Sequence, residues 1–190
     1  EIVKEEDTVL VLGDTSWGMN MNEAKEDLDI INNLPGKKVF IKGNHDFWWS
    51  SLNKLKSTYE EISFLQNSYY KYGNIGICGT RGWLCPNEVK FDKDDEKIYK
   101  REQLRLKMSL DSAVKDGCDE LIVITHYPPT NDKLETSEFT KIYEEYNVKK
   151  VIYGHLHGKE SFEMGLRGER NGVEYILASS DYIDFKPIKM

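Results

Sequence analysis

Four short apolar runs of the chain each lead, within about three residues, into a polar side chain that can bind a metal ion. The runs cover residues 9–12, 39–41, 121–124 and 151–153, and the polar residues are Asp14, Asn44, His126 and His155. Runs of this kind are typical of strands buried on both faces, and the carboxyl ends of neighbouring strands in a layered α/β sheet line one cleft. The pattern therefore favours folds in which four strands deliver ligands to a common edge.

Strand-like and helix-like segments alternate along the chain. Runs rich in Val, Ile, Leu and Tyr predict strands at residues 8–12, 38–41, 74–78, 120–124, 150–153 and 173–178. The stretches between them predict helices at residues 20–34, 48–59, 95–115 and 135–146. Residues 69–72, followed by Gly73 and Asn74, predict a hairpin, so part of the sheet is expected to be antiparallel. With 190 residues, we expect one mixed α/β domain spanning residues 1–190.

Charge and cysteine content exclude several classes of protein. The 26 basic and 33 acidic residues give a net charge of −7, which repels nucleic acid backbones and anionic membranes. No apolar run approaches the roughly 20 residues that span a bilayer. The three cysteines are an odd number without a C-x-x-C pair, which favours a reducing compartment. We expect a cytoplasmic protein with neither membrane nor nucleic acid as its partner.

The residue types at the strand ends indicate a catalytic metal centre. Carboxylate, amide and imidazole ligands without a thiolate suit a catalytic site better than a structural zinc site. All four histidines of the chain lie in these segments, and His155 and His157, two residues apart, point the same way in an extended segment. Taken singly, Asp14, Asn44 and His126 also fit a turn, a helix cap or a loop. The joint pattern favours a metal site that clamps a phosphoryl group.

The motifs resemble those of the calcineurin-like metallophosphoesterases. Gly13-Asp14, G-N-H-D at 43–46, the single His126 and G-H-L-H at 154–157 stand in the family's order and approximate spacing. The resemblance implies a four-layer αββα sandwich of two mixed β-sheets. It also implies two divalent metal ions, with manganese, iron and zinc all suited to the ligands, and hydrolysis of phosphoester bonds by a metal-bound hydroxide that attacks phosphorus.

The same resemblance assigns roles to the metal ligands. Asp14 would bridge the two ions. Asn44, His126 and His155 would complete the shell of the second ion, and His157 would reach the first.

The other two residues of the G-N-H-D motif would be catalytic. His45 would stabilise or protonate the leaving-group oxygen. Asp46 would hold the His45 imidazole in its useful tautomer.

The chain departs from the family pattern at one point. Upstream of Asp14 there is no D-x-H motif, which supplies two ligands of the first metal in the family. We therefore expect that the chain lacks an N-terminal strand and helix, that only Asp14 and His157 remain for the first ion, and that its binding and catalysis are weakened. The alternative is a catalytically degenerate fold that acts as a binding or scaffolding module. A metallo-β-lactamase is excluded because H-x-H-x-D-H is absent.

Two further features lie outside these motifs. Arg81, in G-T-R-G-W at 79–83, is predicted to direct its guanidinium at a substrate phosphate, the alternative being a surface-loop arginine. Trp48 and Trp49 suit either core packing or a base-stacking platform. The small size favours a small phosphorylated substrate over a folded protein. The choice among monoester, diester, nucleotide and phosphoprotein stays open, as does the oligomeric state.

Overall fold

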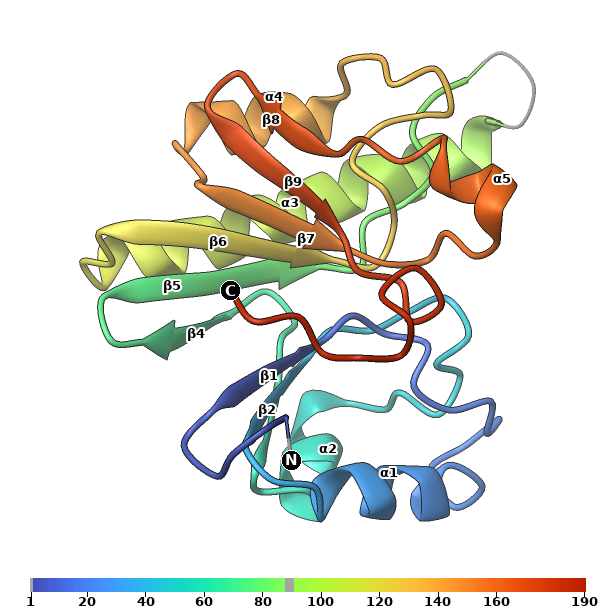
Figure 1. The fold of residues 1–190 in the computed structure, drawn as a ribbon, viewed down its shortest axis with the longest axis vertical. Coiled ribbons are helices and arrows are strands. Elements are labelled where there is room, and N and C mark those ends of the chain that lie inside the picture. Colours follow the sequence, from blue (N-terminus) through green and yellow to red (C-terminus); the bar gives the residue numbers. More distant parts are fainter. Residues whose placement is uncertain (1, 88–90) are drawn as a thin grey trace.

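The computed structural model describes residues 2–87 and 91–190, which form two β-sheets with helices outside them (Figure 1). The smaller sheet has the order β1-β2-β3, and all its strands are parallel. Its strands are β1 (Thr8–Val11), β2 (Lys37–Phe40) and β3 (Ile62–Phe64). The parallel connections run through α1 (Lys25–Asn32) and α2 (Leu52–Thr58), as parallel pairing requires a crossover.

The larger sheet is mixed and has the order β4-β5-β6-β7-β9-β8. Antiparallel hairpins form both of its edges, and the central strands β5, β6, β7 and β9 are parallel. Its strands are β4 (Tyr69–Tyr72), β5 (Ile75–Thr80), β6 (Glu120–Thr125), β7 (Lys150–Tyr153), β8 (Gly168–Arg170) and β9 (Val173–Leu177). The crossover helices are α3 (Lys93–Lys115) and α4 (Glu138–Glu145), and the short α5 (Lys159–Phe162) follows β7.

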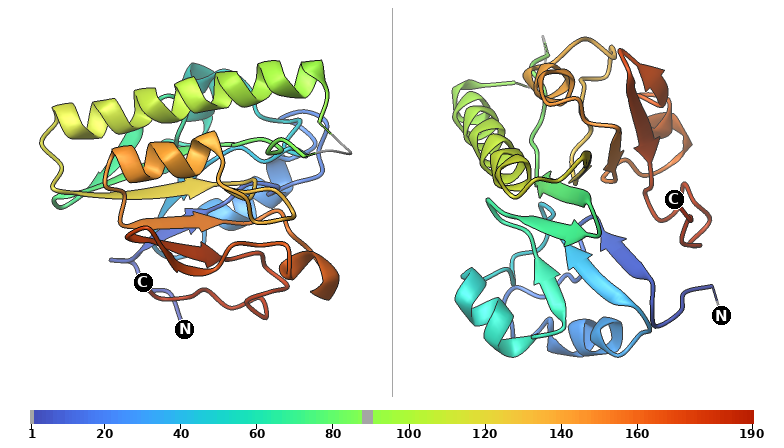
Figure 2. Two further views of the ribbon diagram at one scale, coloured as in Figure 1. Left: turned by 90° about the horizontal axis from the view of Figure 1, so that it is seen from above. Right: turned by 90° about the vertical axis from the view of Figure 1, so that its left-hand side faces the viewer.

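Three apolar clusters hold the layers together. Ile41, which directly follows the middle strand of the smaller sheet, meets Ile124 and Ile152 of the larger sheet in the central cluster. A second cluster lies beneath α1 and α2, and a third joins α3 and α4 to the outer face of the larger sheet. The right-hand view of Figure 2 shows α1 and α2 on the opposite side of the molecule from α3 and α4. The predicted αββα sandwich is therefore confirmed, but only the larger of its two sheets is mixed, because helical crossovers make all three strands of the smaller sheet parallel.

The predicted elements are largely confirmed, with shifts at their ends. The hairpin at residues 69–78 forms as expected. The helix predicted from residue 48 begins only at Leu52, because Ser51 is its N-cap and Trp48 is a core residue with 1% of its surface exposed. The helix predicted from residue 95 begins at Lys93, after a capping box on Asp92. The three-residue strands β3 and β8 were not predicted.

Helix α3 has a buried and an exposed face along its whole length. Leu106 and Leu110 are fully buried against the larger sheet, whereas Leu104 and Met108 are exposed. Charged residues occupy much of the exposed face, and among the described residues no helix is both long enough and apolar enough to cross a membrane. The helix is therefore the outer cover of the larger sheet.

All three cysteines are free thiols. Cys78 in β5 and Cys85 are buried, and burial raises the pKa of each thiol to about 12. Cys118, just before β6, is partly exposed. Buried thiols of this kind are unreactive, which agrees with the absence of a cysteine ligand from the predicted centre.

Two leucines of α3 test the assignment of its buried face. We expect Leu106→Ala to lower the free energy of unfolding by about 2–5 kcal/mol, because it leaves a cavity in the core. Leu104→Ala, on the same helix with the side chain 64% exposed, should change it by less than about 0.5 kcal/mol. Urea unfolding followed by circular dichroism measures both. Equal losses in the two variants would contradict the packing described here.

Candidate metal centre

The loops that follow β1, β2, β6 and β7 meet at one end of the sandwich. These four strands run parallel within their sheets, so their carboxyl ends lie on the same side. The loops place Asp14, Asn44, His126 and His155 side by side, as the sequence predicted. Ligand atoms of Asp14, His126 and His155 all lie within 4.8 Å of one another.

Asn44 and His126 stand at the middle of this group. The Nε2 atom of His126 lies 2.7 Å from Asn44 Oδ1 and 3.3 Å from Asp14 Oδ2. The Nδ1 atom of His155 lies 3.0 Å from the same Asn44 oxygen and 3.1 Å from His126 Nε2. Two oxygens and two ring nitrogens thus point at a common centre.

The group has more lone pairs facing one another than it has protons to place between them. The Nδ1 atom of His126 lies 2.8 Å from the carbonyl oxygen of Leu12, which only accepts hydrogen bonds, so the proton of the neutral ring is on Nδ1. Its Nε2 then presents a lone pair to the oxygens of Asp14 and Asn44. A proton on His155 Nδ1 is able to form a hydrogen bond with either Asn44 Oδ1 or His126 Nε2, but not with both. A divalent cation satisfies all four atoms at once, and N and O ligands of this kind suit manganese, iron and zinc.

The pKa shifts follow from the same crowding. Burial, together with the neighbouring His126, lowers the pKa of His155 to about 4, so this ring is neutral at physiological pH. Burial would raise the pKa of Asp14, but its neighbours His126 and His45, the latter donating its backbone N–H to the carboxylate, outweigh burial and the pKa is lowered. A neutral imidazole and an ionised carboxylate are the forms that bind metal ions.

A buried carboxylate, Asp46, ties two of the ligand loops together. It is fully buried and accepts hydrogen bonds from the backbone N–H groups of Asp14, Thr15 and Gly43, at 2.7–2.8 Å, and from the indole of Trp48 at 2.9 Å. None of these donors is the His45 ring. The prediction that Asp46 orients His45 is therefore corrected: its oxygens are used by backbone N–H groups, and it positions the Asp14 and Asn44 loops.

The same two loops approach each other so closely that only glycine fits between them. A Cβ atom on Gly43 would lie 2.1 Å from Asp14 Oδ1, and one on Gly13 would lie 2.4 Å from the Gly43 nitrogen. Asp14 itself has a φ of 53° and His155 one of 69°, both in the left-handed region. Strained backbone of this kind is typical of functional sites.

His157 lies beside the centre with a partner of its own. Its Nδ1 lies 2.9 Å from Asp181 Oδ1, and the other carboxylate oxygen of Asp181 accepts the backbone N–H of Gly158 at 2.9 Å. Its side chain is 56% exposed, and it is not in the group of Asp14, His126 and His155. A carboxylate on Nδ1 leaves Nε2 as the free ligand atom, a common arrangement in metal-binding histidines.

Sequence reasoning assigned no role to Asp181. It follows β9, the neighbour of β7 in the larger sheet, and so lies at the same end of the sandwich as the candidate ligands. The rule that polar residues after the carboxyl ends of neighbouring strands line one cleft applies to Asp181 as well.

His45 lies at the open side of the centre between two aromatic rings. Its backbone N–H donates to Asp14 Oδ1 at 2.8 Å. Its imidazole stacks on Trp17, with ring centroids 4.8 Å apart, and meets the edge of Phe47 at 6.1 Å. Trp17 is 77% exposed and Phe47 is 53% exposed. Aromatic contacts therefore position this ring.

The family comparison agrees with this donor set. The model of the calcineurin-like phosphoesterase family matches residues 1–159, which contain all the predicted ligands. The chain belongs to the calcineurin-like phosphoesterase family. Members are metal-dependent, and Asp14, His126 and His155 form a group that is able to bind a metal ion.

Other comparisons add little to the family assignment. The crystal structure of the protein of unknown function AQ665 from Aquifex aeolicus is similar at 20% identity, with a TM-score of 0.48. That similarity covers 98% of this chain and 74% of the other. No curated protein matches. The argument about function therefore depends on the calcineurin-like phosphoesterase family and on the site itself.

Arg81 borders the candidate metal centre through its backbone. Its carbonyl oxygen accepts the N–H groups of His126 and Tyr127, at 3.1 and 3.0 Å. Its guanidinium lies over the Trp83 ring, 4.5 Å from the centroid, and the side chain is only 17% exposed. It is therefore a largely covered cation beside the site and not a surface-loop arginine.

Two glycines test the close approach of the ligand loops. We expect Gly43→Ala to weaken Mn²⁺ binding by at least about tenfold, because the added methyl group collides with the Asp14 carboxylate. Gly154→Ala also adjoins a ligand, but its Cβ would lie 3.6 Å from the nearest atom, and it should bind Mn²⁺ like the wild type. Isothermal titration calorimetry compares the three proteins. Equal affinities would show that the loops separate without cost.

Asp46 provides a second test. Asp46→Asn replaces an acceptor oxygen with an NH₂ group that faces N–H donors, so the free energy of unfolding should fall by roughly 2–4 kcal/mol. The exposed Asp184→Asn is the matched control and should be close to the wild type. Chemical denaturation of the metal-free proteins measures both. A fully stable Asp46→Asn would contradict the tethering role.

Proposed function

We propose that this protein hydrolyses phosphoester bonds of small substrates with the help of a divalent cation held by Asp14, Asn44, His126 and His155. The observation that carries the proposal is the group of four lone-pair donors at 2.7–3.3 Å, which its own protons do not satisfy. Membership of the calcineurin-like phosphoesterase family supports the same chemistry. A cation bound there would polarise the phosphoryl oxygens and lower the pKa of a water molecule.

The residues around the ligands set the geometry for this reaction. Leu12 fixes the tautomer of His126 through its carbonyl oxygen, and Asp46 holds the Asp14 loop through backbone N–H groups. These contacts are made by the chain's own backbone and side chains, so the fold itself holds the ligand atoms together. Such preorganisation reduces the cost of reaching the reactive arrangement.

We propose that His45 donates a proton to the leaving group. Its ring is held by Trp17 and Phe47 at the open side of the centre, where a leaving group would depart. Its backbone N–H binds Asp14, so the ring is kept next to the ligands. General acid catalysis by a positioned imidazole contributes about 10²- to 10⁴-fold to the rate.

His157 and Asp14 are the residues that would serve a second cation. The Asp181 carboxylate orients His157 with Nε2 free, which supports this role. Two protein ligands hold an ion more weakly than four. We therefore propose that the site of Asp14, Asn44, His126 and His155 fills first and that a dinuclear centre forms only at higher metal concentration.

Metal binding and hydrolysis are tested together with one matched pair. Asn44→Ala removes a ligand and should weaken Mn²⁺ binding by at least about tenfold. Asn74→Ala alters an exposed amide in the β4–β5 turn and should bind Mn²⁺ and hydrolyse p-nitrophenyl phosphate like the wild type. Calorimetry and release of p-nitrophenol give the two readouts.

His45 separates catalysis from metal binding. His45→Ala should retain Mn²⁺ affinity and lose about 10²- to 10⁴-fold in kcat for substrates with a poor leaving group. Undiminished activity would refute the proposed role of His45. Metal binding without hydrolysis of any phosphoester by the wild type would instead favour the degenerate binding module.

A further inference from the structure

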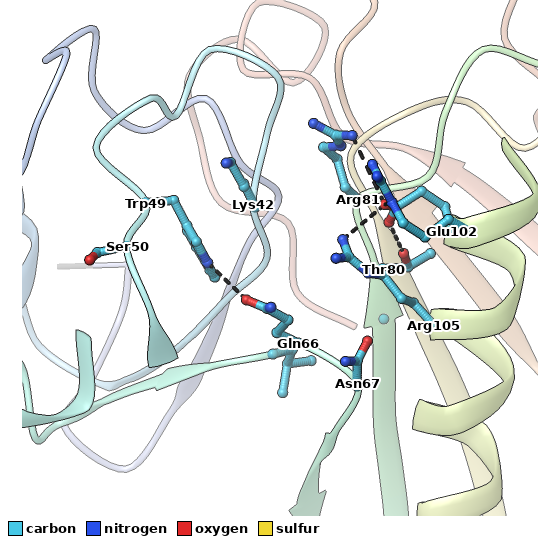
Figure 3. Close-up of a pocket in the computed structure, with 12 residues that line it drawn as sticks. Lys42, Trp49, Ser50, Gln66, Asn67, Thr80, Arg81, Glu102 and Arg105 are labelled. Atoms are coloured by element: carbon cyan, nitrogen blue, oxygen red, sulfur yellow. Dashed lines mark hydrogen bonds and ion pairs between the residues drawn. The ribbon is translucent and has the colours of Figure 1, made fainter. Parts of the chain in front are cut away.

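A cavity of about 320 Å³ opens between the two sheets beside the metal centre (Figure 3). Lys42 follows the small sheet, Arg81 follows β5, and α3 supplies Arg101, Glu102 and Arg105 to its wall. Figure 3 shows Trp49 beside Lys42, across the cavity from Arg81 and Arg105, with Gln66 and Asn67 between the two sides. Neither the metal ligands nor His45 belong to this lining.

The cavity is strongly positive in a negative protein. Four cationic side chains and a single carboxylate line it, which leaves three positive charges, whereas the whole chain carries −7. Cations gathered in a partly enclosed cavity repel one another unless an anion joins them. The charge of the lining therefore indicates an anionic occupant.

Glu102 organises the cations without neutralising them. Its side chain is 1% exposed and accepts hydrogen bonds from Thr80 Oγ1 at 2.6 Å and Arg105 Nη1 at 2.9 Å. Its Oε1 atom also lies 4.0 Å from Arg81 Nη2. Because several groups share this one carboxylate, it holds the guanidinium groups in place but does not satisfy all their N–H donors, and Arg81 Nε is left without a partner.

Two of the cationic side chains, Arg81 and Lys42, have N–H groups without a hydrogen-bond partner among the described residues. The Nε–H group of Arg81 is buried and has no hydrogen-bond partner. Among the described residues, no hydrogen bond or ion pair is formed by the Lys42 ammonium group, which belongs to the same lining as Arg81 and Arg105. Buried donors are nearly always satisfied in folded proteins, so the Arg81 Nε–H group points to a ligand, and the half-buried Lys42 ammonium group in the same lining is able to bind it too.

The cavity shares its border with the metal centre. Lys42 precedes the ligand Asn44 by two residues, and the backbone of Arg81 binds the N–H of His126. A molecule with one group at the metal centre is thus able to extend a second group toward the cavity. Guanidinium forks match the oxygens of phosphate, and a surplus of three positive charges suits a dianion better than a monoanion.

We propose that this cavity is a phosphate-binding site that takes a second phosphate group of the substrate. The substrate class is then a small molecule that carries two phosphate groups, one hydrolysed at the metal centre and one held by Lys42, Arg81 and Arg105. The assignment of this group to the substrate rests on the proposed function, whereas phosphate binding in the cavity does not.

Binding is tested without metal and without catalysis. Inorganic phosphate is titrated into the protein in excess chelator, with acetate as the monoanionic comparison. We expect phosphate to bind more tightly than acetate, and Lys42→Met to weaken phosphate binding by about tenfold or more. Lys100→Met, an exposed lysine on α3 that pairs with Glu96, should bind phosphate like the wild type.

The stability of Lys42→Met separates this role from a structural one. Because the ammonium group lies near other cations and forms no ion pair, its removal should leave the melting temperature unchanged or raise it. Phosphate should then raise the melting temperature of the wild type and of Lys100→Met but not that of Lys42→Met. Absence of phosphate binding, or equal binding by Lys42→Met, would overturn the site whether or not the protein hydrolyses phosphoesters.

The substrate class is tested by kinetics with Mn²⁺ present. Fructose bisphosphate is compared with the two fructose monophosphates, and we expect kcat/KM to favour the bisphosphate by about tenfold or more in the wild type and in Lys100→Met. Lys42→Met should lose most of this preference. Hydrolysis without any preference would overturn the assignment to substrate. Phosphate binding without hydrolysis would overturn the proposed function and leave the phosphate site standing.

Discussion

The organisation of the site depends on one buried carboxylate. Asp46 collects N–H groups from the loops after β1 and β2, and both loops carry ligands of the proposed centre. A carboxylate with no solvent contact is costly unless its oxygens accept hydrogen bonds, and here four donors supply them. The close packing of Gly13 on Gly43 becomes possible because this charge holds the two turns together.

The sandwich brings distant parts of the sequence to the same end. His126 and His155 come from the larger sheet and Asp14 and Asn44 from loops of the smaller one, so the centre exists only where both sheets meet. The apolar cluster around Ile41 and Ile124 holds that junction. Packing between the sheets and geometry at the centre are therefore properties of the same interface.

The sequence predicted the layers and the ligand group, because strand runs and the residues at their ends are local signals. It did not predict the role of Asp46, whose donors are mostly backbone N–H groups that no residue type reveals. It also missed the partner of His157, since Asp181 lies 24 positions away. The basic cavity was beyond sequence reasoning because Lys42 and Arg105 meet only after α3 has packed over β5. Strands of three residues, such as β3, carry too little periodicity to detect.

The three thiols of this protein differ in accessibility, which permits selective labelling of one of them for spectroscopy. Cys78 and Cys85 lie in the core with pKa values of about 12, so maleimide reagents at neutral pH should bypass them. Cys118 is the accessible thiol and lies before the amino end of β6, at the opposite end of that strand from His126. A fluorophore attached there labels the protein without engineered cysteines and without crowding the end that carries the candidate metal centre.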